Sequence, residues 1–113
     1  MKILYPTQTA SEAMAANPSR PATAVVHDSP DVRLLVFRLR PGQSVSPHQN
    51  ASTVLLTVLA GSGMVSDADS ERSVVEGDMV CYEPNELHGM QATDQEFLIL
   101  ATIAPRPGIR SGA

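Results

Sequence analysis

The sequence has few of the residues that nucleic-acid-binding proteins use. Its 113 residues carry a net charge of −4, with Lys2 as the only lysine. It has no Trp, two Phe and two Tyr, which leaves little aromatic surface on which bases could stack. Proteins that bind DNA or RNA need a clustered basic face. We therefore expect no nucleic-acid partner, and we interpret Arg33, Arg38 and Arg40 as the solvated edge of one strand.

Cysteine and long apolar runs are scarce as well. Cys81 is the single cysteine, so no disulfide can form within the chain. Because it lies in the apolar run 79–82, we expect a buried, unreactive thiol. No stretch reaches the roughly 18 apolar residues of a membrane-spanning helix, and Pro6 interrupts the first segment too early for the core of a signal peptide. We expect a cytoplasmic protein with no membrane partner.

Turn-forming residues, in contrast, are frequent. Nine prolines and seven glycines divide the chain into short segments, and apolar or β-branched runs recur roughly every 8–12 residues. This rhythm predicts an all-β fold, a sandwich or a closed barrel, with almost no room for helices. The length allows one domain, residues 1–113, with a barrel core over about residues 22–104.

The apolar runs place the expected strands along the chain. We expect strands at residues 24–27, 32–39, 53–59, 64–66, 73–75, 79–82 and 97–103. The last of these is apolar on both faces, which predicts burial on both sides. One short helix is predicted at residues 10–16, because residues 9–12 have the spacing of a capping box and Asn17-Pro18 would end it.

Two segments combine a glycine, a histidine and turn residues at fixed spacing. In residues 42–61, Gly42 is followed after five residues by His48, and Gly61 closes the segment. In residues 77–92, a Gly-Asp pair is followed by a proline turn and by His88, eleven residues after the glycine.

These segments resemble the paired motifs of the cupin superfamily, and the chain is similar to its small stand-alone members. The resemblance implies a double-stranded β-helix, the RmlC-like jelly-roll barrel, with one short N-terminal helix added here. Pro84 stands one place later than in the family pattern, and Asn85 occupies a position where glycine is common. Asn tolerates positive φ better than other non-glycine residues, so we expect the turn to be retained.

In the family, three His and one Glu converge on a divalent metal inside the barrel. The resemblance places His48 and His88 at two of these positions, Asn50 at the third, and Val54 (or Thr53) where the Glu would be. Strand alternation would keep Asn50 and Val54 on the inward face of His48. Two imidazoles and an amide lack an anionic ligand, so the implied cofactor is one weakly held Fe, Zn, Ni or Mn ion.

The same residues allow a site without metal. Imidazole titrates near pH ~6.5, so His48 and His88 could shuttle protons or bind a small-molecule ligand directly. Tyr82 and Met90 could line the pocket, although core packing explains them equally well. Two functions stay open: a metal-dependent oxygenase or isomerase acting on a small organic molecule, and a binding or regulatory protein without turnover.

The resemblance also implies a homodimer. Small cupins commonly pair across a two-fold axis, the most frequent symmetry of soluble oligomers. Residues 1–8 and the helix after them could cover a barrel end or swap onto the partner.

Overall fold

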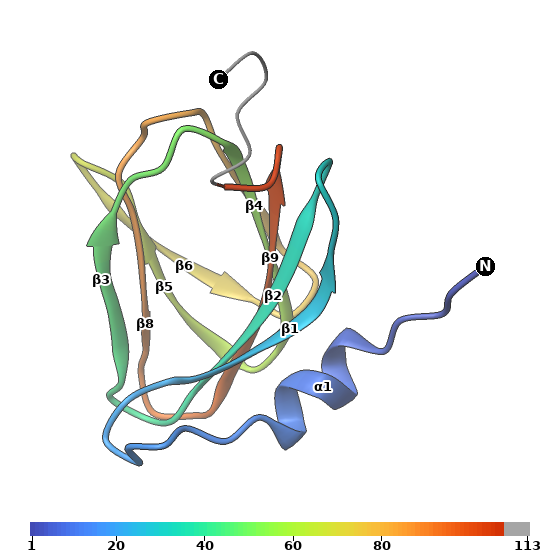
Figure 1. Cartoon of the computed structure of the whole chain (residues 1–113). Coiled ribbons are helices and arrows are strands. Elements are labelled where there is room, and N and C mark those ends of the chain that lie inside the picture. Colours follow the sequence, from blue (N-terminus) through green and yellow to red (C-terminus); the bar gives the residue numbers. More distant parts are fainter. Residues whose placement is uncertain (108–113) are drawn as a thin grey trace.

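The computed structural model describes residues 1–107 and confirms the all-β prediction (Figure 1). One helix precedes nine strands in this described part of the chain. The elements are α1 (Pro6–Glu12), β1 (Ala22–Asp28), β2 (Arg33–Leu39), β3 (Ser44–His48), β4 (Thr53–Ala60), β5 (Ser62–Ser66), β6 (Glu71–Val75), β7 (Met79–Tyr82), β8 (His88–Ala92) and β9 (Phe97–Ala104).

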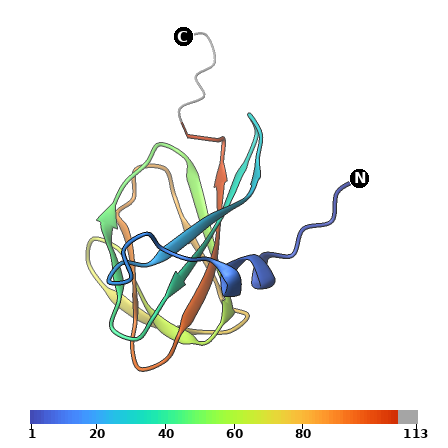
Figure 2. The same ribbon diagram turned by 60° about the horizontal axis from the view of Figure 1, so that its bottom comes forward.

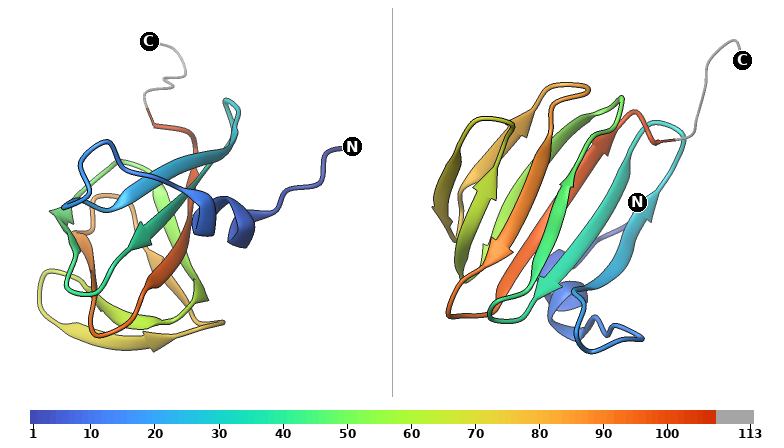
Figure 3. Two further views of the ribbon diagram at one scale, coloured as in Figure 1. Left: turned by 90° about the horizontal axis from the view of Figure 1, so that it is seen from below. Right: turned by 90° about the vertical axis from the view of Figure 1, so that its left-hand side faces the viewer.

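Two antiparallel sheets face each other and enclose the core (Figures 2 and 3). The first has the strand order β1-β2-β9-β4-β7, and the second has the order β3-β8-β5-β6. Because β2 lies between β1 and β9, the prediction that its arginines mark a sheet edge is wrong. Arg38 instead pairs with Glu96, at 3.0 Å between Nε and Oε2.

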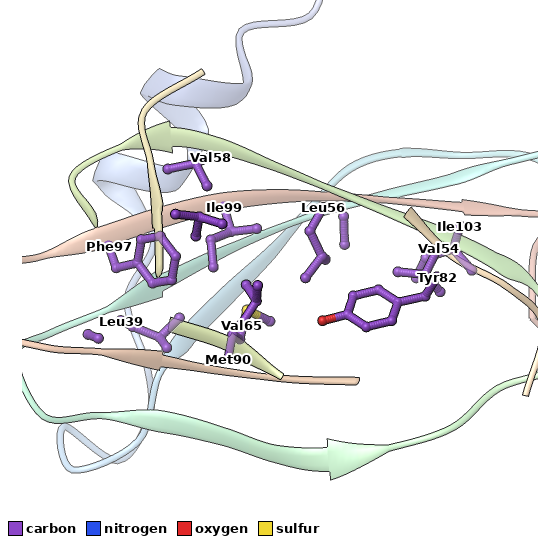
Figure 4. Packing of buried hydrophobic residues seen from close by; sticks show 13 residues of the cluster. Leu39, Val54, Leu56, Val58, Val65, Tyr82, Met90, Phe97, Ile99 and Ile103 are labelled. Carbon is purple, nitrogen blue, oxygen red and sulfur yellow. The ribbon is translucent and has the colours of Figure 1, made fainter. Parts of the chain in front are cut away.

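The core fills the space between the sheets, and Phe97, Leu39 and Ile99 lie at one end of it, with Tyr82 toward the other (Figure 4). Phe97, Leu39 and Ile99 are fully buried there, and burying a side chain of this size contributes about 1.5–3 kcal/mol. The ring of Phe97 packs against Gly63, where an added Cβ would lie only 2.5 Å from the ring. Close packing of these side chains therefore closes this end of the barrel.

A smaller cluster covers the outer face of the five-stranded sheet. Ala10 of α1 is buried against Val36 and Leu98. The helix begins and ends earlier than predicted, and the capping box is wrong. Pro6 starts it, where a missing N–H costs nothing, and Thr9 lies inside the helix, donating its hydroxyl to the carbonyl of Tyr5. No helix among residues 1–107 is long and apolar enough to cross a membrane.

Two further predictions need correction. β3 and β8 were not expected, because both are short and contain proline or glycine among polar residues, so that only pairing with neighbours identifies them as strands. Cys81 was expected to be buried, but it is exposed. In β7 the alternation directs Tyr82 inward and therefore Cys81 outward.

Candidate functional site

His48 and His88 lie opposite each other on two neighbouring strands. β3 pairs with β8, and His48 is the register partner of His88. The register shifts between Val45 and His48, where β3 has one extra residue. Val45 pairs with the buried Met90, so regular alternation would turn His48 to the outer face. The bulge brings the two rings to the same side.

Gly89 makes room for this bulge. A Cβ at Gly89 would lie 2.8 Å from Oγ of Ser66 and 3.3 Å from Cγ of Pro47. Pro47 is tolerated because β3 is the edge of its sheet. Sequence reasoning missed the bulge, although a proline beside the motif histidine is a signal that could have indicated it.

Each imidazole is held by a backbone carbonyl two residues earlier in the chain. Nδ1 of His48 lies 3.1 Å from the carbonyl oxygen of Ser46, and Nδ1 of His88 lies 3.2 Å from that of Glu86. A carbonyl can only accept, so both Nδ1 atoms carry the proton. In the neutral rings both Nε2 atoms then keep a free lone pair. No pattern in the sequence indicates these two carbonyl contacts.

The two rings are close together but differ in burial. Their centroids lie 4.0 Å apart at an interplanar angle of 61°. His88 is only 4% exposed, whereas His48 is exposed. Burial lowers the pKa of His88, and the positive charge of a protonated His48 would lower it further, although the Glu86 carbonyl acts in the opposite direction. These shifts favour the neutral, proton-accepting form of His88.

The residues expected to line the pocket belong to the buried core. Val54 pairs with Tyr82 across β4 and β7, and both are buried in the core cluster together with Met90. The ring centroid of Tyr82 lies 5.1 Å from that of His88. Figure 4 shows the Tyr82 ring directed into the barrel, between Val54 and Met90. Core packing accounts for all three side chains, and the ring of Tyr82 in addition lies beside His88.

The Tyr82 hydroxyl is tied to the opposite sheet. It donates to the backbone carbonyl of Ser66 at 2.8 Å. Burial, assisted by the nearby carboxylates of Asp67 and Glu86, raises the pKa of Tyr82 to about 12, so the hydroxyl stays protonated. A cavity of about 150 Å³ on the flank of the barrel is lined by Tyr82, Ser66 and Glu86, among others.

Asn50 takes a structural position in the loop after β3. The strand ends at His48, so alternation does not extend to Asn50, contrary to our expectation. The Oδ1 atom of Asn50 accepts the amide of Ser52 at 2.9 Å, and its carbonyl accepts the amide of Asn85 at 2.7 Å. Asn85 has φ +68°, which confirms the expected left-handed turn. The loops of the two motifs are thereby fastened to each other.

The donor set fits only part of a metal centre. Within residues 1–107, no group of three or more His, Cys, Asp or Glu side chains lies close enough to hold an ion together. A catalytic zinc-type centre uses three protein ligands. His48 and His88 supply two, and the amide oxygen of Asn50 is already an acceptor in its own turn. The residues present therefore do not fit a complete catalytic centre.

Comparison with known proteins identifies the family. The profile of the Cupin domain matches residues 35–103. The chain belongs to the cupin family. No curated protein matches it.

Solved structures of other cupins share the fold. An uncharacterised conserved protein with a double-stranded β-helix domain from Klebsiella pneumoniae is 20% identical, with TM-score 0.79, over 89% of this chain and 90% of that one. An RmlC-like cupin from Desulfovibrio desulfuricans is 25% identical, with TM-score 0.74, over 83% and 91%. The DMSP lyase DddQ from Ruegeria pomeroyi is 19% identical, with TM-score 0.71, over 85% of this chain and 53% of that one. These likenesses confirm the predicted cupin barrel and establish no activity.

Proposed function

We propose that this cupin binds a small organic molecule at the histidine pair, with the two Nε2 atoms as hydrogen-bond acceptors. The observation that carries the proposal is that both Nδ1 atoms donate to backbone carbonyls, which leaves both Nε2 lone pairs free. A ligand for this site presents a hydroxyl or another donor to His48 and His88. We expect its body to be apolar, because the ring of Tyr82 lies 5.1 Å from that of His88.

The site is suited to proton transfer as well as binding. His88 is buried and its pKa is lowered, so it accepts a proton without first having to lose one. General-base catalysis by a positioned imidazole typically contributes about 10²–10⁴-fold in rate. An isomerase- or lyase-type reaction on the bound molecule is the enzymatic form of the proposal, and a regulatory ligand site is its non-enzymatic form.

A second candidate is a weakly held divalent ion at the same two Nε2 atoms. Imidazoles that ligate metals almost always donate their other N–H to a carbonyl or carboxylate, as both rings do here. We propose Fe, Zn, Ni or Mn as the ion, because imidazole is a ligand suited to first-row transition metals. With two protein ligands, an ion would depend on water or the ligand for its remaining positions, so we expect weak binding.

Variants of the two histidines distinguish an enzyme, a regulatory ligand site and a metal site. His88→Leu removes the acceptor, whereas His88→Gln keeps a polar amide but cannot act as a base at neutral pH. His27→Gln is the matched control, because His27 is the remaining histidine and lies on β1 of the other sheet. Binding of a panel of small phenols, hydroxy acids and diols is measured by thermal shift and calorimetry, with Zn²⁺ and Ni²⁺ titrated separately.

We expect a ligand from the panel to bind the wild type and His27→Gln, and to bind His88→Leu at least about tenfold more weakly. Tenfold corresponds to about 1.4 kcal/mol, close to the net contribution of a hydrogen bond. Loss of turnover but not of binding in His88→Gln would identify an enzyme. Equal binding to wild type and to a His48→Leu/His88→Leu double variant would overturn the proposal.

A further inference from the structure

A basic groove lies between the segment that follows α1 and the end of the five-stranded sheet. This segment, residues 13–21, runs below the lower end of the barrel in Figure 1 before β1 begins. The groove is a cavity of about 100 Å³, several times the roughly 30 Å³ that one water molecule occupies in the liquid. Its charged lining residues are Arg20, Arg38 and Arg40, and no acidic side chain of residues 1–107 lines it.

Alternation along β2 explains why two of these arginines lie here. Val36 is on the outer face of the sheet, where it is buried beneath α1. Arg38, two residues later, shares that face, and its register partner Ala22 lines the groove with it. Arg40 follows in the turn between β2 and β3. The same face therefore changes from apolar to basic beyond α1, and residues of the segment 13–21 form the opposite wall.

Side-chain hydrogen bonds hold the two walls of the groove together. Nη1 of Arg38 donates to the carbonyl of Ala13 at 3.2 Å, and Nε of Arg38 donates to Glu96 at 3.0 Å. Nε2 of Gln43 donates to the carbonyl of Pro18 at 3.1 Å. The groove is therefore formed by contacts within the chain itself. A site that is already ordered has a smaller entropic cost of binding.

Most of the positive charge in the groove is not neutralised within the described chain. Glu96 pairs with Arg38. The other ion pairs within residues 1–107 engage arginines outside the groove, so Arg20 and Arg40 have no carboxylate partner there. A recess lined by one sign of charge concentrates the potential inside it and attracts the opposite charge. The planar fork of a guanidinium matches the geometry of a carboxylate, so an organic acid suits this lining.

An apolar surface adjoins the arginines. Met14 is 87% exposed, and together with Ala15 and Arg20 it also lines a second, wider depression beside the groove. This depression has a volume of about 480 Å³, and its remaining lining residues carry no charge. A molecule whose anionic group lies at the arginines can therefore place a hydrocarbon chain against Met14.

We infer that this groove binds the carboxylate of a small organic acid. Arg20 and Arg40 are the anion-binding residues, and Met14 contacts the hydrocarbon chain of the ligand. The groove is separate from the histidine pair, because β3 begins next to Gln43 and ends at His48, so that the two sites lie at opposite ends of this strand. A ligand in the groove leaves both histidines free, and the inference does not depend on the proposed function.

Binding of simple anions to the full chain tests the inference. Acetate, butyrate, hexanoate and inorganic phosphate are titrated separately, by calorimetry and with backbone ¹H–¹⁵N spectra. Arg20→Gln and Arg40→Gln each remove one charge from the groove. Arg72→Gln is the matched control, because it removes the same charge from an exposed position on β6 of the other sheet. Met14→Ser removes the apolar contact at an exposed position.

We expect hexanoate to bind the wild type and Arg72→Gln with equal affinity, with a dissociation constant below about 1 mM, and to shift the amide signals of residues 13–20. Arg20→Gln and Arg40→Gln should each weaken binding at least about tenfold, because hydrogen bonds between charged groups are among the stronger ones. Met14→Ser should reduce the gain in affinity from acetate to hexanoate. Circular dichroism should be unchanged in all variants.

Four results would overturn the inference or a part of it. Hexanoate that does not saturate the wild type by about 10 mM would exclude the site, and so would equal affinity in the wild type, Arg20→Gln and Arg40→Gln. Tighter binding of inorganic phosphate than of hexanoate would contradict the assignment to an organic acid. Binding that is lost in a His48→Leu/His88→Leu variant but kept in both arginine variants would assign the ligand to the histidine pair instead.

Discussion

The two ends of the barrel are built on different principles. At one end, Phe97, Leu39 and Ile99 fill the space between the sheets with apolar volume, and Phe97 packs directly on Gly63. At the other end, His48 and His88 are oriented by single hydrogen bonds to backbone carbonyls. Strand β8 contributes to both ends, with His88 at its start and Ala92 at its finish. The largest fully buried side chains therefore lie at the closed end, and the two histidines lie at the other end.

The largest expected effect is on the closed end. Phe97→Ala removes the largest fully buried side chain and leaves a cavity beside Gly63, so we expect a loss of about 3–5 kcal/mol in the free energy of unfolding. Urea denaturation measures it. Val75→Ala, at an exposed position on β6, serves as the control and should stay within about 0.5 kcal/mol. A loss below about 1 kcal/mol for Phe97→Ala would mean that this end is not the stable part of the barrel.

A second, smaller effect tests the close contact itself. Gly63→Ala places a methyl group against the Phe97 ring and the carbonyl of Gln91, which should cost about 1–3 kcal/mol. In a Phe97→Leu background the cost should fall, because the ring that obstructs the methyl group is gone. The double-mutant cycle should give a coupling of about 0.5 kcal/mol or more. Additive free energies would remove the packing explanation for Gly63.

The smallest effect is expected at the histidine end, and it depends on pH. Burial lowers the pKa of His88 below the 6.5 of a free imidazole, so the unfolded chain binds the proton more readily than the folded one. Stability is then unaffected at high pH and falls as the pH drops below about 6.5. His88→Leu should make the urea midpoint less dependent on pH between about pH 5 and 8. His27→Gln is the comparison, and an unchanged pH dependence in His88→Leu would contradict the assigned burial effect.

The sequence predicts strands and turns better than the histidine site. The apolar runs at residues 53–59 and 97–103 were sufficient to predict two strands, and Val54 and Phe97 in these strands lie in the core. The glycines and Asn85 of the two motifs also indicated the turns, and Asn85 has the positive φ that its position required. These features are local, so that a single segment contains the whole signal.

The histidine end depends on contacts between segments, which local patterns do not show. The bulge in β3 is defined only by its pairing with β8, and without it alternation from Val45 would direct His48 outward. The two carbonyls that fix the rings belong to Ser46 and Glu86, and any residue type could supply them. Asn50 was misplaced for the same reason, since the end of β3 is set by the loop contact with Asn85.

The central claim is that both histidines are held with a proton on Nδ1 and a free lone pair on Nε2. Long-range ¹H–¹⁵N correlation spectra of the imidazoles, recorded at about pH 8 and assigned with the variants of His27, His48 and His88, test this most directly. The structure predicts a protonated Nδ1 and an unprotonated Nε2 for both His48 and His88. Spectra showing the proton on Nε2 of both rings would contradict the account, because neither ring could then accept a hydrogen bond or bind an ion at that atom.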